Sequence, residues 1–203
     1  KTIKEVVNVC KKYGDVIVIN DSSTDSTLQI IKRLNIHFLN NNKNLGYEAS
    51  LFKCLYYAVK NFDYDYFITL DGDGQFNEHA IKKALKQIKN NKIFISGIRN
   101  IKNRKIEILA DKIFYRIFKI YDPLCGLKIY SRKILKLSAH KNLEGLLGMN
   151  MILFCLINKV EIHQFKINIQ LRKGESTFGG IFKSNLFIGL SLFKFFYKYV
   201  LYK

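Results

Sequence analysis

Two pairs of aspartates stand out because each pair closely follows an apolar run. Asp21 and Asp25 come after a Val-Ile-Val-Ile run, and Asp71 and Asp73 come after a Phe-Ile-Thr-Leu run. Runs of this kind are typical of buried parallel strands. Ligands of open α/β sheets bind beyond the carboxyl ends of the strands. Both pairs are therefore expected at a ligand-binding edge.

Asp71 and Asp73 form an Asp-x-Asp motif between glycines. The motif places two hard oxygen ligands near one point, while Gly72 and Gly74 let the backbone turn tightly and approach a ligand. Such oxygens suit Mg²⁺ or Mn²⁺ bridging a diphosphate, where the metal would neutralise charge on the leaving group. A solvated acidic turn is the alternative, but the position after a strand and before Gln75 favours a metal site.

The elements that must position these residues alternate along the chain. Strands are expected at residues 15–20, 36–39, 66–70, 93–95 and 160–171, and helices at residues 28–34, 47–60, 78–89, 105–120 and 145–158. This alternation predicts an α/β domain with a mostly parallel sheet flanked by helices. Residues 174–180 are expected to form a glycine-rich loop.

Composition agrees with one globular domain of 203 residues, 48% hydrophobic and 25% charged. The net charge of +18 implies an acidic partner, such as nucleic acid, anionic lipid headgroups or phosphorylated small molecules, unless it only reflects a lysine-rich genome. The four cysteines form no C-x-x-C pair and lack zinc spacing, which predicts reduced thiols in a cytosolic protein. Neither a signal peptide nor a membrane-spanning apolar stretch is visible.

Six segments, in order, resemble motifs of family 2 glycosyltransferases, which have the GT-A (Rossmann-like) fold. Residues 18–27 resemble V-D-D-G-S-x-D-x-T, residues 44–46 resemble N-x-G, residues 96–99 resemble G-S-R, residues 122–128 resemble D-x-x-S/C-G-F-R/K, and residues 171–176 resemble R-x-G-x-S. Residues 70–76 resemble D-A-D-G-Q-H, a form typical of dolichyl- and polyprenyl-phosphate sugar transferases.

The resemblance implies a role for each residue on the donor side. Asp21 would lie against the nucleoside and Asp71 would contact the nucleotide. Asp73 and Gln75 would hold the metal, Mg²⁺ or Mn²⁺. Arg172 and Ser176 would lie on a loop that closes over the diphosphate of the nucleotide sugar.

On the acceptor side, the resemblance implies that Arg99 and Arg104 grip a phosphate, for which an arginine fork is well suited. Asp122 would line the site, so that Asp73, Arg99 and Asp122 form the catalytic set. A phosphate acceptor is already an anion and needs no strong base. The expected reaction is an in-line displacement that inverts the anomeric carbon, with metal and arginines supplying the electrostatic stabilisation.

Simpler roles compete with these assignments. Asp25 could only cap the following helix, Arg99 and Arg104 could belong to a basic surface loop, and Asp122 before proline could simply start a turn. Cys125 is expected to be a packed residue, not a nucleophile.

The beginning of the chain departs from the family pattern. Family members open with a strand that ends in a P-x-Y-N-E-like segment, whereas residues 1–7 are expected to form the helix after it. We therefore expect a GT-A domain at residues 1–180 that lacks the first strand of the family. Either the chain is a fragment, or it is a degenerate member with impaired nucleotide binding.

Residues 181–203 are rich in Phe, Leu, Ile and Tyr and are interrupted by lysines, of which Lys194 and Lys198 share one helix face. This pattern predicts an amphipathic helix lying in the membrane interface, with its charge attracted to anionic headgroups. A terminal helix packed on the core is the alternative.

Together these features predict a metal-dependent hexosyltransferase. It would move a sugar from a nucleotide-sugar donor to a polyprenyl (dolichyl- or undecaprenyl-type) phosphate. It would act in cell-envelope glycan biosynthesis, in the cytoplasm and peripheral to the cytoplasmic face of the membrane.

The sequence also allows three other interpretations of function. A family 2 glycosyltransferase acting on a glycan hydroxyl would need a carboxylate base, for which Asp122 is the candidate. A basic nucleic-acid-binding module fits the charge, but no such motif is present and no nucleic acid is expected as a partner. An inactive scaffold would follow from the missing first strand.

Overall fold

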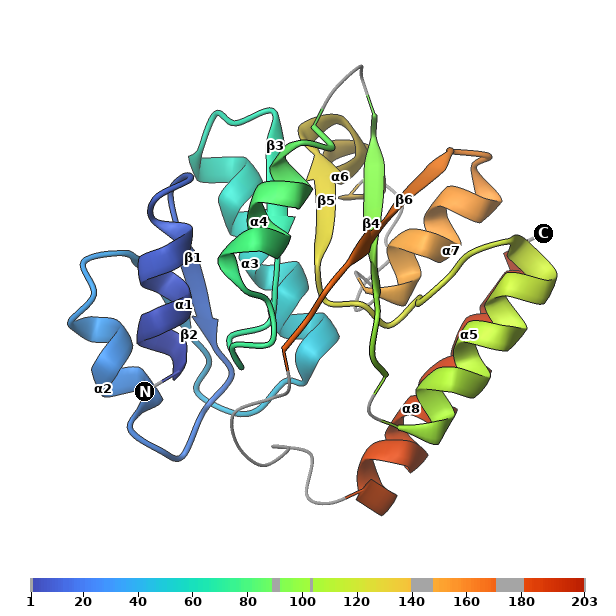
Figure 1. The fold of residues 1–203 in the computed structure, drawn as a ribbon, viewed down its shortest axis with the longest axis horizontal. Helices are drawn as coiled ribbons and strands as arrows, with labels where there is room; N and C mark the ends of the chain where they lie inside the picture. The colour runs from blue at the N-terminus through green and yellow to red at the C-terminus, as the bar shows by residue number, and fades with distance from the viewer. Residues whose placement is uncertain (1, 89–91, 103, 140–147, 171–180, 203) are drawn as a thin grey trace.

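The computed structural model describes residues 2–88, 92–102, 104–139, 148–170 and 181–202 (Figure 1). The elements are α1 (Thr2–Cys10), β1 (Ile17–Asn20), α2 (Thr27–Lys32), β2 (His37–Asn40), α3 (Tyr47–Asn61), β3 (Tyr66–Thr69), α4 (Glu78–Leu85), β4 (Phe94–Arg99), α5 (Lys105–Phe118), β5 (Lys128–Ser131), α6 (Arg132–Ala139), α7 (Met149–Ile157), β6 (Ile162–Ile167) and α8 (Ile181–Tyr202). The alternation of strands and helices confirms the predicted α/β class.

The described strands form two sheets. β1 and β2 pair in parallel, and the second sheet has the order β3-β5-β4-β6. In the second sheet β4 and β6 are parallel, whereas β5 runs antiparallel to both of its neighbours. β3, β4 and β6 therefore share one direction, as expected of a mostly parallel sheet, and β5 alone opposes them.

The path of residues 119–127 explains the direction of β5. After α5, this segment runs back to the carboxyl edge of the sheet, where Asp122 accepts the backbone N–H of Arg99 at the end of β4. The following Gly126 lies against Asp71, just beyond the end of β3. Since β5 starts at this carboxyl edge, it can enter the sheet between β3 and β4 only in the opposite direction.

The four-stranded sheet is covered on both faces. Because successive strand residues point to opposite faces, Phe94 and Tyr130 pack into one core with α5, α7 and α8. Ile95 and Ile129 pack into a second core with α4. The seven residues from Met149 to Cys155 in α7 are all buried, as expected for a helix that is apolar on every side.

α8 joins the first core along one side. Leu192 and Phe195 are buried, and the ring of Phe195 lies 4.7 Å from that of Phe114 in α5. Within the part of the chain that the structure describes, no helix is long and apolar enough to cross a membrane.

Candidate active site

The Asp-x-Asp turn begins directly beyond β3, as predicted. Asp71 lies so close to Gly126 that a Cβ built on this glycine would fall 2.3 Å from the Asp71 carboxylate. Asp73 accepts the backbone N–H of Gln75 at 3.1 Å. Burial and the charge of Asp73 raise the pKa of Asp71, while Arg99, Lys128 and a hydrogen bond with Tyr47 act in the opposite direction. The turn therefore carries two carboxylates, and the positive charges of Arg99 and Lys128 act on the first of them.

Asp21, just beyond β1, holds the loop that follows β2 through hydrogen bonds. Its carboxylate accepts the N–H groups of Leu45 and Gly46 at 2.8 Å each and the amide of Asn41 at 2.9 Å. Burial alone would raise the pKa of Asp21, but these hydrogen bonds outweigh it and lower the pKa. Gly46 has φ of 86°, a conformation that favours glycine.

The first turn of α3 connects the two aspartate clusters. Asp21 binds the residues immediately before this turn, and the hydroxyl of Tyr47 is a hydrogen-bond partner of Asp71. Both β1 and β3 therefore end at the start of α3, which places Asp21 and Asp71 at the same edge of the molecule. Glu48 extends the connection by accepting the N–H of Gly148, next to α7, at 2.6 Å.

Arg99 and Asp122 form a buried ion pair. The Nε and Nη2 atoms of Arg99 donate to the two oxygens of Asp122 at 2.9 and 2.8 Å, and their side chains are 8% and 1% exposed. Burial works against the guanidinium charge, but Asp122 raises its pKa above the ordinary value. Asp122 has φ of 44° and is held further by its own N–H, which donates to Asp111 at 2.6 Å.

Glu107 links this pair to the second predicted arginine. It lies 3.7 Å from Arg99 and 3.1 Å from Arg104, and its side chain is 7% exposed. Arg104 immediately precedes α5 and is the more accessible of the two arginines, with 20% of its side chain exposed. The structure thus places both arginines around one carboxylate, with Arg99 inside and Arg104 toward the surface.

Gln75 fits the predicted ligand role in one respect. The residue is buried, and its amide nitrogen has no hydrogen-bond partner within the described part of the chain. As placed, the amide nitrogen would donate to an oxygen such as that of a phosphate, whereas a metal would be bound by the amide oxygen with the group turned over. The donor set of carboxylate and amide oxygens suits Mg²⁺ or Mn²⁺. No group of three His, Cys, Asp or Glu ligands occurs among residues with described positions, so a metal here would also rely on the amide and on the diphosphate.

Two predicted residues, Arg172 and Ser176, lie outside the described residues. The preceding Gln170 is described, and it donates its N–H to the carbonyl of Gln75 at 2.9 Å, next to the Asp-x-Asp turn. Asp25 is exposed, and its carboxylate accepts the N–H of Thr27 at the start of α2, which agrees with the capping alternative.

The sequence analysis gave no role to Lys128, a charged residue that the structure places at the site. Lys128 is buried in β5, and its ammonium donates to the carbonyls of Pro123 and Cys125. Its place as the last residue of the 122–128 motif, between Leu127 and Ile129, is the signal that could have identified it. Cys125 is buried, and burial raises the pKa of its thiol to about 12, so it stays a protonated packing residue.

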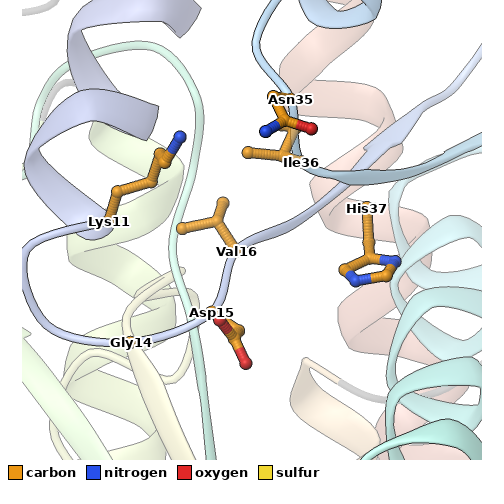
Figure 2. Close-up of a pocket in the computed structure, with 7 residues that line it drawn as sticks. All are labelled: Lys11, Gly14, Asp15, Val16, Asn35, Ile36 and His37. Atoms are coloured by element: carbon orange, nitrogen blue, oxygen red, sulfur yellow. The ribbon is translucent and has the colours of Figure 1, made fainter.

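A separate hollow lies at the starts of β1 and β2, away from the candidate site residues. It has a volume of 280 Å³ and is lined by Lys11, Gly14, Asp15, Val16, Asn35, Ile36 and His37 (Figure 2). These residues surround the starts of β1 and β2, opposite the ends that carry Asp21 and Asn40. The hollow is therefore not part of the candidate active site.

Comparison with known proteins identifies the family and the fold. Residues 1–147 match glycosyl transferase family 2. An uncharacterised protein of Methanocaldococcus jannaschii is 30% identical over 157 residues, which make up 67% of this chain and 69% of the relative. Glucosyl-3-phosphoglycerate synthase from Mycobacterium tuberculosis, solved with Mn²⁺, UDP and phosphoglyceric acid, superposes with a TM-score of 0.69 at 14% identity, covering 94% of this chain and 73% of that one.

A second crystal structure of the same synthase, with Mn²⁺, UDP and glucosyl-3-phosphoglycerate, gives a TM-score of 0.68 at 14% identity and covers 94% of this chain and 74% of that one. The fold is that of the GT-A glycosyltransferases, with acidic residues at the carboxyl edge of the strands. The chain belongs to glycosyl transferase family 2.

Proposed function

We propose that the protein transfers a hexose from a nucleotide-sugar donor to a polyprenyl phosphate at the cytoplasmic surface of a membrane, with inversion at the anomeric carbon. The observation that carries the donor side is that Asp21 and Asp71 both bond to residues at the start of α3, while Asp73 and Gln75 follow Asp71 in the same turn. The matched synthase was solved with Mn²⁺ and UDP-glucose, which supports the same donor class for this chain.

The metal would be held by Asp73 and Gln75. When bound, Mg²⁺ or Mn²⁺ supplies positive charge to the diphosphate leaving group. The chain itself contributes Asp71, oriented by Tyr47 and Gly126, and Asp21, which fixes the loop before α3. Arg172 and Ser176 are proposed to contact the diphosphate.

Arg99 and Arg104 are proposed to receive the acceptor phosphate. Arg104 is the more exposed and would meet the phosphate directly, while Arg99 adds a fixed positive charge behind it. Asp122 would act by holding Arg99. Since both oxygens of Asp122 accept from Arg99, Asp122 is poorly placed as a base, which disfavours a glycan hydroxyl as the acceptor.

α8 is the proposed contact with the membrane. Five of its exposed large apolar residues follow helical spacing on the side away from the core, namely Leu186, Leu190, Phe193, Tyr197 and Val200. No acidic residue occurs in α8. Peripheral attachment through this helix would hold the active site next to a lipid-linked acceptor.

Calorimetric titration with UDP, GDP and dTDP, each with and without Mn²⁺, tests the donor side. We expect one nucleotide to bind in a metal-dependent manner and Asp73→Asn to lose that binding. Asp65→Asn, an exposed aspartate at the start of β3, is the matched control and should bind normally. Failure of all three nucleotides to bind would refute the proposal.

The acceptor is tested separately by incubating the protein with radiolabelled nucleotide sugar and either a polyprenyl phosphate or phosphoglycerate. Label that appears in the organic phase would support the lipid acceptor. Label transferred only to phosphoglycerate would replace the lipid with a small phosphorylated acceptor.

A further inference from the structure

The solvent-facing side of α5 has an unusual composition. Ala110 and Phe114 are buried, while Ile108, Leu109 and Tyr115 are 45%, 52% and 41% exposed. The exposed residues recur at helical spacing, so they share one face. This face presents large apolar side chains to water along a helix whose opposite side already packs on the core.

The charges on the same face are all basic. Lys105, Lys112 and Arg116 are exposed, and the two carboxylates of the helix are turned away from water. Glu107 is buried between Arg99 and Arg104. Asp111 pairs with Lys102 at 2.8 Å and accepts the N–H of Asp122. An apolar face with only positive exposed charge matches an anionic lipid surface.

Aromatic residues mark the carboxyl end of α5. The rings of Tyr115 and Tyr121 stack with centroids 4.4 Å apart, and the ammonium of Lys119 lies 5.1 Å from the Tyr115 ring. All three residues are exposed. Tyrosines have an apolar body and a polar tip and are favoured at the boundary between lipid and water.

α5 also lies beside α8. Phe114 and Phe118 of α5 contact Phe195, Phe196 and Tyr199 of α8, and Figure 1 shows the two helices side by side at one end of the molecule. Lys198 of α8 is partly buried, and this burial lowers its pKa. The two helices therefore form one packed unit in which both members carry exposed apolar residues and basic side chains.

From these observations we infer that the outer face of α5 is a second membrane-contacting surface, which binds an anionic bilayer together with α8. This inference rests on the proposed function. It deepens that proposal because α5 starts directly after Arg104, whose side chain is tied to Glu107 in the first turn. Contact between α5 and the bilayer would bring the two arginines to the depth of the lipid phosphates.

Single-tryptophan fluorescence tests the contact directly, because the chain contains no tryptophan. Leu109→Trp probes α5 and Phe193→Trp probes α8. Tyr56→Trp, at an exposed position of α3, is the matched control. Each variant is mixed with vesicles of phosphatidylcholine and phosphatidylglycerol in equal parts. We expect a blue shift and quenching by brominated lipid for the α5 and α8 probes, and no change for the control.

Charge and apolar variants of α5 provide a second measurement, by co-sedimentation with the same anionic vesicles and with neutral vesicles of phosphatidylcholine alone. Replacing Lys112 and Arg116 with glutamine should weaken vesicle binding about fivefold for each charge removed. Lys60→Gln with Lys136→Gln, two exposed lysines elsewhere, should leave binding unchanged. Ile108→Ser with Leu109→Ser should weaken binding to neutral and anionic vesicles alike, whereas Tyr56→Ser with Leu137→Ser should not.

Two outcomes would overturn the inference. An α5 probe that stays unshifted while the α8 probe shifts would mean that α8 alone docks. A protein that ignores both kinds of vesicle but sediments as a dimer, and becomes monomeric in the Ile108→Ser and Leu109→Ser variant, would show that a second copy covers this face. Nucleotide binding is measured on the same samples, so failure of the donor proposal is distinguishable from failure of membrane contact.

Discussion

Asp122 accepts three hydrogen bonds from Arg99. One carboxylate oxygen accepts the backbone N–H and the Nε–H of Arg99, and the other accepts an Nη2–H. This pair fastens the end of β4 to the segment that leads into β5. It also fixes a guanidinium next to the Asp-x-Asp turn, where its charge acts on the pKa of Asp71. The pair therefore serves both the fold and the electrostatics of the site.

Breaking this pair should destabilise the fold. Asp122→Ala leaves a buried guanidinium without its main partner, which is expected to cost about 3–5 kcal/mol of unfolding free energy. Urea denaturation followed by circular dichroism measures the cost. Asp63→Ala, which removes a fully exposed partner of Arg132, should have little effect. Equal losses in the two variants would argue against the buried pair as a structural element.

A methyl group at residue 126 should disturb the donor site. A Cβ there would meet the Asp71 carboxylate at 2.3 Å. Gly126→Ala must therefore displace either the backbone at residue 126 or the Asp71 side chain, at a cost of about 1–3 kcal/mol of unfolding free energy. We expect nucleotide binding to weaken more than stability alone explains. Gly14→Ala is the control, because a Cβ at that position meets nothing within 4 Å. Unchanged calorimetric affinity in Gly126→Ala would refute the role of this contact.

Replacing Gln75 should have opposite effects on the stability of the ligand-free protein and on nucleotide binding. The buried amide nitrogen has no partner within the described residues, so Gln75→Leu is expected to stabilise the ligand-free protein by about 1 kcal/mol. The same variant should lose metal-dependent nucleotide binding. Thermal unfolding with and without nucleotide and Mn²⁺ measures both effects. A destabilised variant that still binds normally would contradict the proposed metal-ligand role.

The stability contribution of Asp21 should depend on pH. Its pKa in the folded state is lowered by hydrogen bonds from Leu45, Asn41 and Gly46. A lowered pKa means that the contribution is present above the ordinary aspartate pKa of about 3.9 and is lost as the pH falls through the folded value. Asp21→Asn should therefore be less stable than the unchanged protein at neutral pH.

At acidic pH the difference between the two proteins should shrink, because protonation of Asp21 removes the same interactions. Urea unfolding across this range measures it, with Asp65→Asn as the comparison. A stability difference that is constant with pH would show that the charge of Asp21 is not what holds the loop.

The elements of the fold were largely predictable from local patterns. The helix expected at residues 47–60 is α3 (Tyr47–Asn61), the strand expected at residues 66–70 is β3 (Tyr66–Thr69), and the helix expected at residues 105–120 is α5 (Lys105–Phe118). Their periodicity and bounding polar residues are local features. α6 was not predicted, and the predicted helix at residues 78–89 ends earlier, at Leu85, because helix ends are weakly encoded.

By itself, the sequence determined the α/β class and which acidic residues lie just beyond strands, because strand ends and motif spacing are written within a few residues. Only the tertiary structure decided which groups meet. Arg99 pairs with Asp122 across 23 positions, Gly126 gives room to Asp71, and the antiparallel entry of β5 brings them together. Such contacts depend on how the chain returns to the sheet edge, a long-range outcome of packing that local patterns do not specify.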